Sequence, residues 1–134
     1  MPNTPVNPDT LFTMPGFHQV VVSTGSRTIH IAGQGAFDAD MKLIGVGDYR
    51  LQAARAFQNL ALALAAAGAR PEDVVSSHMF VKDLTPQATE QFVAGMNEAL
   101  DGSPFPANAS SLIGVAALAH PDMLVEISAI AITD

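Results

Sequence analysis

A single carboxylate, Glu126, lies within an apolar run over residues 123–132 near the end of the chain. A charged side chain in a buried strand is unfavourable unless it is paired or functional. Two interpretations are open. A structural carboxylate would accept hydrogen bonds from backbone groups across a subunit boundary, whereas a functional one would position or activate a water molecule. Ser128 is two residues away on the same side of the expected strand, so it forms a polar pair with Glu126 and not a triad.

The other residues that could do chemistry do not form a recognisable site. The histidines have no cysteine partner and no metal-site spacing, so we expect hydrogen-bonded or solvated side chains at His18, His30, His78 and His120. Ser110 and Ser111 lack the flanking glycines of a nucleophile elbow. The glycine pairs at 33–35 and 45–47 lack the lysine of a phosphate loop. We therefore expect no metal and no cofactor.

Charge and composition disfavour several classes of function. The net charge is -7, and the six basic residues are spread along the chain, which argues against nucleic-acid binding. No apolar run reaches the roughly 18 residues of a membrane helix, so we expect no membrane contact. Cysteine is absent and the first residues do not resemble a secretory signal, so we expect a cytoplasmic protein. Hydrophobic residues make up 49%, a surplus that predicts an interface between copies of the chain.

One domain over residues 1–134 is expected to position these side chains. Prolines in the first 16 residues predict an irregular lead-in. The expected strands are short apolar stretches bounded by turn residues, and they cover 18–23, 28–33, 74–81, 111–118 and 123–132. We predict that the first two form a hairpin. The last two are predicted to form a second hairpin, or a close strand pair, around the turn at 119–122.

Two helices are predicted to connect these strands. The first begins at the N-cap Asp48 and ends near Ala67, and the second begins at Thr85 and ends before Gly102. The order β-β-α-β-α-β-β gives an α+β fold, in which right-handed crossovers place both helices on one face of the sheet. No third helix is expected to cover the other face. The apolar surplus therefore predicts that the sheet packs against copies of itself in a closed oligomer.

Several short motifs resemble those of a known family in their order and spacing. They are Ala32-Gly33-Gln34, the helix end 65–69 with 72–75, Phe80-Val81-Lys82-Asp83-Leu84, and the pair 115–118 and 124–131. None is specific alone, but together they extend over residues 15–132. By these motifs the sequence resembles the RidA/YjgF family, also called endoribonuclease L-PSP.

The resemblance implies a chorismate-mutase-like fold and a homotrimer, in which strands of three subunits form a barrel with clefts between subunits. In the best-known members these clefts hydrolyse imine and enamine intermediates, releasing ammonia and a 2-oxo acid. An arginine holds the substrate carboxylate, a glutamate helps to position water, and a tyrosine and a serine line the pocket. Glu126 matches the glutamate, and Gly33 and Gln34 match the residues after the serine.

Three pocket positions depart from the family pattern. Ser110 stands at the arginine position, Phe17 at the tyrosine and Ala32 at the serine. Serine cannot replace the charge of a guanidinium group that pairs with a carboxylate. The sequence therefore resembles the branch of the family that lacks the arginine. Another arginine could supply the charge from elsewhere, and the sequence offers Arg27 and Arg50.

Two functions remain open at this point. The first is a hydrolase or deaminase acting on a C=N or related bond of a small, uncharged or weakly polar molecule. Glu126 would position water, backbone groups near Gly33 and Gly114 would polarise the substrate, and Ser111 would join the ligand-binding residues. The second is a non-catalytic trimer that binds a small ligand or acts like a chaperone. A ribonuclease, suggested by the older family name, is disfavoured by the acidic charge.

Overall fold

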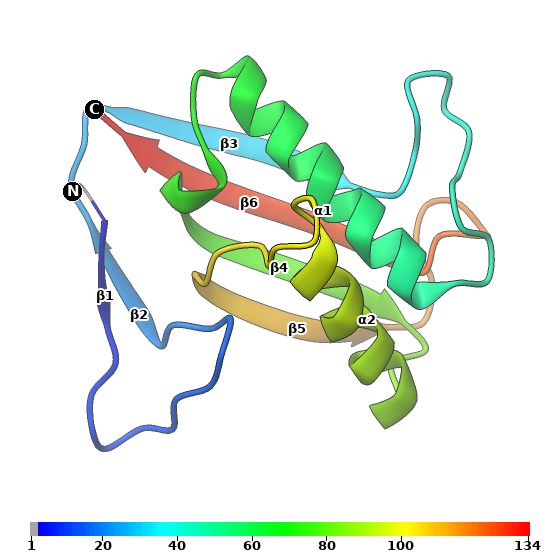
Figure 1. Cartoon of the computed structure of the whole chain (residues 1–134), viewed down its shortest axis with the longest axis horizontal. Helices are drawn as coiled ribbons and strands as arrows, with labels where there is room; N and C mark the ends of the chain where they lie inside the picture. Colours follow the sequence, from blue (N-terminus) through cyan, green and yellow to red (C-terminus); the bar gives the residue numbers. More distant parts are fainter. Residues whose placement is uncertain (1–2) are drawn as a thin grey trace.

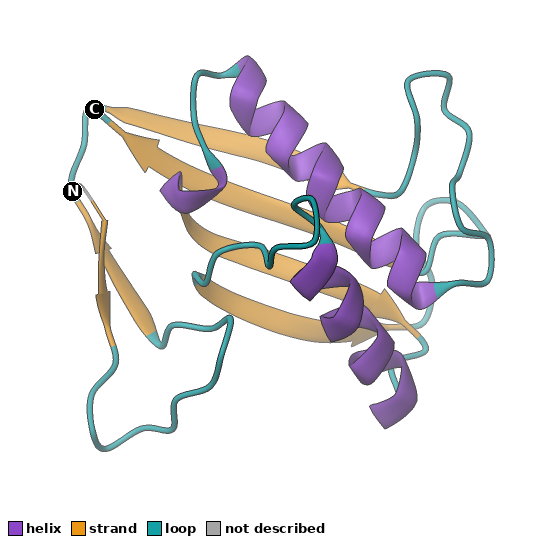
Figure 2. Cartoon of the chain, in the orientation of Figure 1, coloured by secondary structure: helices purple, strands orange, loops and turns teal. Residues whose placement is uncertain are grey.

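The computed structural model describes residues 3–134 and shows an α+β fold with both helices on one face of a sheet (Figure 1). The strands are β1 (Asn3–Val6), β2 (Val20–Ser23), β3 (Arg27–Gln34), β4 (Val74–Lys82), β5 (Ala109–Val115) and β6 (Val125–Thr133). The helices are α1 (Tyr49–Ala66), the 3-10 turn η1 (Pro71–Asp73) and α2 (Pro86–Glu98) (Figure 2). The predicted class and the placement of the helices are confirmed.

The main sheet has the strand order β3-β6-β4-β5, so the predicted terminal hairpin is wrong. Strand β6 runs antiparallel between β3 and β4, while β5 pairs in parallel with β4. The turn at 119–122 therefore carries the chain across β4 instead of back along β5. Every second residue of β6 is buried beneath the helices: Val125, Ile127, Ala129 and Ala131. Burial of this apolar face favours a central position for β6, which a local turn signal does not encode.

The predicted hairpin of the first two strands is also wrong. Strand β2 pairs antiparallel with β1 in a separate two-stranded sheet, so part of the predicted irregular lead-in is a strand. Pro5 is tolerated there because edge strands accept a residue without an N–H donor. The turn after β2 passes close to the end of β6, where a Cβ added at Gly25 would lie 2.6 Å from the carbonyl oxygen of Thr133. Because of this close approach, β3 begins beside the end of β6, with which it pairs.

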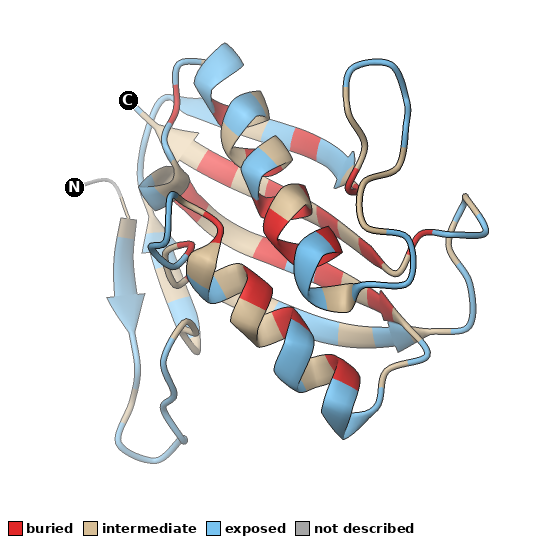
Figure 3. Ribbon diagram, turned by 45° about the vertical axis from the view of Figure 1, so that its right-hand side comes forward, coloured by how far each residue is buried: buried red, intermediate tan, exposed pale blue. Residues whose placement is uncertain are grey.

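The helix ends follow the sequence prediction. The side chain of Asp48 accepts a hydrogen bond from the amide of Leu51 at 3.0 Å, and Thr85 accepts one from Ala88 at 3.0 Å. Gly68 adopts the left-handed conformation, with φ of 76°, directly after the C-cap of α1. Between the helices and the sheet lies the core, visible as buried stripes in Figure 3. No helix among residues 3–134 is long and apolar enough to cross a membrane.

Gln52, on α1, is fully buried and ties the helix to the segment that leads into β6. Its amide nitrogen donates to the carbonyl oxygens of Gly45 and Asp122, both at 3.0 Å, and its oxygen accepts from the amide of Leu124 at 2.8 Å. All three partners belong to loops, and in the described chain the carbonyl of Asp122 and the amide of Leu124 have no other backbone partner, whereas the carbonyl of Gly45 also accepts from the amide of Asp48 at 2.9 Å. Gln52 therefore fixes the two residues that precede β6.

Replacement of Gln52 by leucine is expected to lower the free energy of unfolding by about 2 kcal/mol, because two partly buried backbone groups, the carbonyl of Asp122 and the amide of Leu124, lose their partner. Urea unfolding followed by circular dichroism measures the change. Gln58→Leu is the matched control, since Gln58 is exposed on the same helix, and it should change stability by less than about 0.5 kcal/mol. Equal stability of the two variants would contradict a structural role for Gln52.

Candidate functional site

Glu126 packs directly on the backbone of Gly33, where β3 carries a bulge. The register between β3 and β6 shifts between Ile31 and Gln34. A Cβ added at Gly33 would lie 2.6 Å from Cδ and 2.8 Å from Oε2 of Glu126, so a side chain at this position would displace the carboxylate. Glu126 is half-buried, and within residues 3–134 no side chain pairs with it. The predicted neighbourhood of Gly33 and Glu126 is thus present in one chain.

The side chain of Glu126 points away from the helices, because its neighbours Val125 and Ile127 are buried beneath them. On this open face Glu126 lies opposite Phe80 of β4. The next row along the strands places Ser128 opposite His78, and His78 beside Ser111 of β5. Ser111 therefore shares the face of Glu126. His78 is exposed and stacks on Phe80, with ring centroids 6.3 Å apart.

A second group of predicted residues lines an apolar cavity of about 270 Å³ between α2 and the β5 edge of the sheet. Phe17 and Ser110 both line it, and Phe12 stacks on Phe17 with ring centroids 5.7 Å apart and an angle of 13°. The remaining lining is almost wholly apolar: Met14, Pro15, Gly16, Met79, Phe92, Val93, Met96 and Leu112. Among the described residues no charged side chain lines this cavity.

Asn108 aligns the two segments that carry Phe17 and Ser110. It is buried, its side-chain oxygen accepts a hydrogen bond from Ser77 at 2.7 Å, and its carbonyl accepts one from the amide of His18 at 3.0 Å. Phe17 forms a parallel bridge with Asn108, two residues before Ser110. Sequence reasoning did not find this residue, because its partners Ser77 and His18 are distant in sequence and no local pattern indicates them.

Ser110 and Glu126 do not meet within one chain. Ser110 pairs with Ser77 and faces the helices, whereas Glu126 faces the open side of the sheet. Ala32 lies exposed at the bulge, and its carbonyl accepts a hydrogen bond from the side chain of Gln34 at 3.1 Å. Gly114 lies further along β5, where an added Cβ would be 3.0 Å from Cβ of Leu84. The predicted residues thus fall into two groups on opposite faces, with Gly114 outside both.

Comparison with known proteins gives a consistent result. The family model described as endoribonuclease L-PSP matches residues 10–133. A crystal structure of YyfB from Yersinia pestis, described as a protein of unknown function of the conserved Rid family, is 37% identical. The match covers 98% of this chain and 99% of that chain, with a TM-score of 0.88. This chain belongs to the Rid family.

Two structures with lower sequence identity share the fold. RidA from the Antarctic bacterium Psychrobacter sp. is 25% identical over 90% of this chain and 91% of that chain, with a TM-score of 0.67. A putative endoribonuclease from Thermotoga maritima is 24% identical over 96% and 92%, with a TM-score of 0.65. No match was found among curated protein sequences. The chorismate-mutase-like architecture implied by the sequence motifs is therefore confirmed for this Rid chain.

Proposed function

We propose that this Rid protein is a homotrimer that binds a small molecule in clefts between its subunits. The observation that carries the proposal is the separation of the two predicted residue groups within one chain. Phe17 and Ser110 lie at the β5 edge, whereas Gly33 and Glu126 lie beside β3, the other edge of the same sheet. A ring of three copies would bring the β3 edge of one subunit to the β5 edge of the next. Glu126 of one subunit would then lie beside the strand edge that carries the cavity of its neighbour.

The residues that line the cavity favour a ligand with an apolar group. Its walls are aromatic, methionine and aliphatic side chains, with the hydroxyl of Ser110 as a polar contact. A volume of about 270 Å³ is at the small end of ligand pockets. Phe17 and Ser110 make this pocket less polar than a tyrosine and an arginine would. We therefore propose a ligand with a branched or aromatic group of modest size.

The proposed reaction is hydrolysis of a C=N bond. Glu126 accepts a proton from water as the water oxygen bonds to the imine carbon, and the same proton is then passed from Glu126 to the imine nitrogen to give a carbinolamine. Collapse of this intermediate forms the C=O bond, breaks the C–N bond and releases ammonia. Because Gly33 has no side chain, the Glu126 carboxylate lies against backbone at a bulge, and N–H groups of this bulge would polarise the substrate.

A non-catalytic, ligand-binding or chaperone-like trimer is the alternative proposal. It is favoured by the cavity itself, since no titratable side chain of the described chain lines it. RNA cleavage is disfavoured, because the net charge is -7 and the chain has six basic residues. A cytoplasmic location stays a prediction.

Two measurements test the proposal. Light scattering should give a mass about three times the 14.0 kDa of one chain. For the second measurement, a dehydratase generates 2-aminoacrylate in situ, and an amino-acid oxidase generates the imine of phenylalanine. Release of the 2-oxo acid is followed in the presence of semicarbazide, which competes for the imine. We expect acceleration by the protein, and more for the aromatic imine. A monomer would overturn the composite cleft, and the absence of acceleration for either imine would favour the binding protein.

A further inference from the structure

Arg55 on α1 is held in a fixed orientation by Asn59, one helical turn further on. Nε of Arg55 donates to Oδ1 of Asn59 at 3.1 Å. The amide nitrogen of Asn59 in turn donates to the carbonyl oxygens of Gly35 and Phe37, both at 2.8 Å. The guanidinium group is therefore anchored through one nitrogen to the loop that follows β3, and its position is set before any ligand binds.

The two terminal nitrogens of Arg55 have no protein partner in the described chain, which sets it apart from Arg27 and Arg50. Arg50 forms a bidentate pair with Glu98 at 2.8 and 2.7 Å, and these hydrogen bonds hold the pKa of the Glu98 carboxyl below its usual value. Arg27 donates to the carbonyl of Ala67. Arg70 lies 3.9 Å from Glu72. Neither Arg27 nor Arg50 is thus free to supply the charge missing at position 110.

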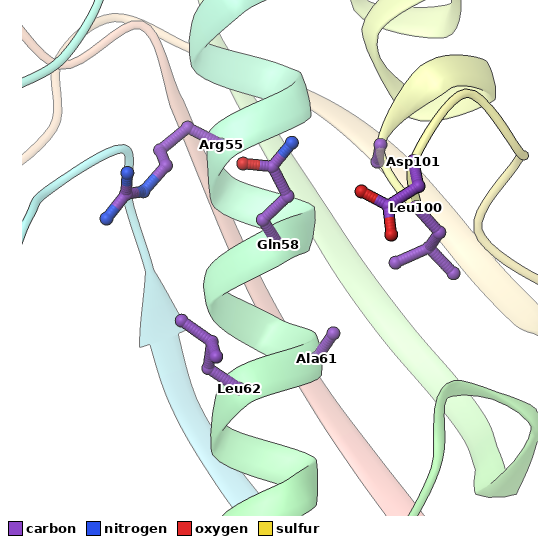
Figure 4. Close-up of a pocket in the computed structure, with 7 residues that line it drawn as sticks. Arg55, Gln58, Ala61, Leu62, Leu100 and Asp101 are labelled. Atoms are coloured by element: carbon purple, nitrogen blue, oxygen red, sulfur yellow. The ribbon is translucent and has the colours of Figure 1, made fainter.

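Arg55 faces a hollow of about 500 Å³ between α1 and the end of β3. Figure 4 shows its guanidinium extending towards the loop after β3, on the side of α1 opposite Asp101. On the strand side the hollow is lined by Gln34 and by the short or apolar residues Gly33, Gly35, Phe37 and Ala39, and on α1 by Leu62 and Ala63. Asp38 also lines it, but its Oδ1 accepts the amides of Asp40 and Lys42 within its own turn.

We propose that Arg55 binds the carboxylate of a small ligand in this hollow. A guanidinium group with two free N–H-bearing nitrogens matches the two oxygens of a carboxylate. A single cation with Asp38 nearby suits a monoanion better than a phosphate dianion. Gly33 lines this hollow and also lies against the side chain of Glu126, so the ligand carboxylate would be held on the α1 side of the Gly33 backbone, with Glu126 on the opposite side.

Arg55 would thus supply, from α1, the cation that Ser110 lacks. The role of the carboxylate as part of a substrate rests on the proposed function, whereas anion binding at Arg55 requires only one chain. A protein of net charge -7 repels anions in general, so saturable binding requires a specific site.

The test titrates the full-length protein with sodium pyruvate at constant ionic strength, against sodium chloride, and follows the arginine Nε–Hε and backbone amide signals by NMR. We expect saturable shifts of the Arg55 signal and of the amides of Gly33 and Gly35. Arg55→Gln should weaken binding by about tenfold or more. Arg55→Lys keeps the charge but loses the paired donors, and should be intermediate. The matched control is Arg70→Gln, which should bind as the parent does.

Each outcome of this titration bears on the inference. Equal affinity of the parent and Arg55→Gln, or shifts at Arg27 and Arg70 alone, would overturn it. Absence of saturable binding while imine hydrolysis persists would overturn it too and leave the proposed function intact. Binding that depends on Arg55 without any hydrolysis would support the anion site and count against the catalytic proposal.

Discussion

Replacement of Gly95 by alanine is expected to lower the free energy of unfolding by about 3 kcal/mol. Gly95 is buried where α2 crosses α1. An added Cβ would overlap the carbonyl oxygen of Arg50, and it would lie 2.8 Å from Cβ of Ala53 and 3.0 Å from the amide nitrogen of Ala54. Two of these three atoms are backbone of α1, so the overlap is relieved only if the helices separate.

This expected loss of stability is opposite in sign to the gain that helix propensity alone would give for glycine to alanine. In an exposed helix interior, glycine to alanine stabilises by about 1 kcal/mol. Asn97→Ala, at an exposed position of the same helix, is the control and should be neutral or slightly stabilising. Urea unfolding is measured at several protein concentrations, because subunit association shifts apparent stability. A Gly95→Ala protein as stable as the parent would show that the helices can move apart without loss of packing.

The helices were predictable because their signals are local. Asp48 and Thr85 cap the two helices through side-chain bonds to amides three residues later, and Gly68 ends the first. These interactions involve neighbours in sequence, so the residue types are sufficient to find them. The buried stripe with Phe57 and Phe92, whose ring centroids lie 5.8 Å apart, follows from helical spacing.

The order of the strands could not be predicted in this way. Whether β6 pairs with β5 or inserts between β3 and β4 depends on burial of its apolar face beneath α1, which is a contact between distant segments. The strand character of residues 3–6 likewise depends on pairing with β2, and Pro5 argues against it locally. Turn residues mark where a strand ends, but they do not identify its partner.

The candidate site was predictable only in part, because some of its residues have local signals in the sequence and others do not. Glu126 was found because a charge in an apolar strand is conspicuous in the sequence, and the family motifs indicated Gly33. Arg55 was missed, because its orientation depends on Asn59, which in turn bonds the carbonyls of Gly35 and Phe37, 24 and 22 residues away from Asn59 in sequence. The sequence also did not show that Ser110 and Glu126 lie on opposite faces of the sheet. This division follows from the register of β4 with both β5 and β6.

The last prediction concerns catalysis by Glu126. Glu126→Gln is expected to slow the proposed imine hydrolysis by about 10² to 10⁴-fold, because the amide has nearly the same shape but cannot accept a proton from water. The assay is release of the 2-oxo acid from the aromatic imine, with the free energy of unfolding measured alongside. Ser128→Ala is the control: it lies on the same strand and face, two residues away, and should retain most of the activity.

Gly33→Ala separates a catalytic role of Glu126 from a merely structural one. The new methyl group would lie 2.6 Å from Cδ of Glu126, so the carboxylate must move while its chemistry is unchanged. If Glu126 positions water, this displacement should reduce the rate by about 10²-fold, since misplacement by about 1 Å is enough for such a loss. If Glu126 is structural, Glu126→Gln and Gly33→Ala would alter stability or trimer formation and leave hydrolysis by the remaining trimer unchanged. Full activity in both variants would therefore remove Glu126 from the mechanism, even if the protein proved to be a hydrolase.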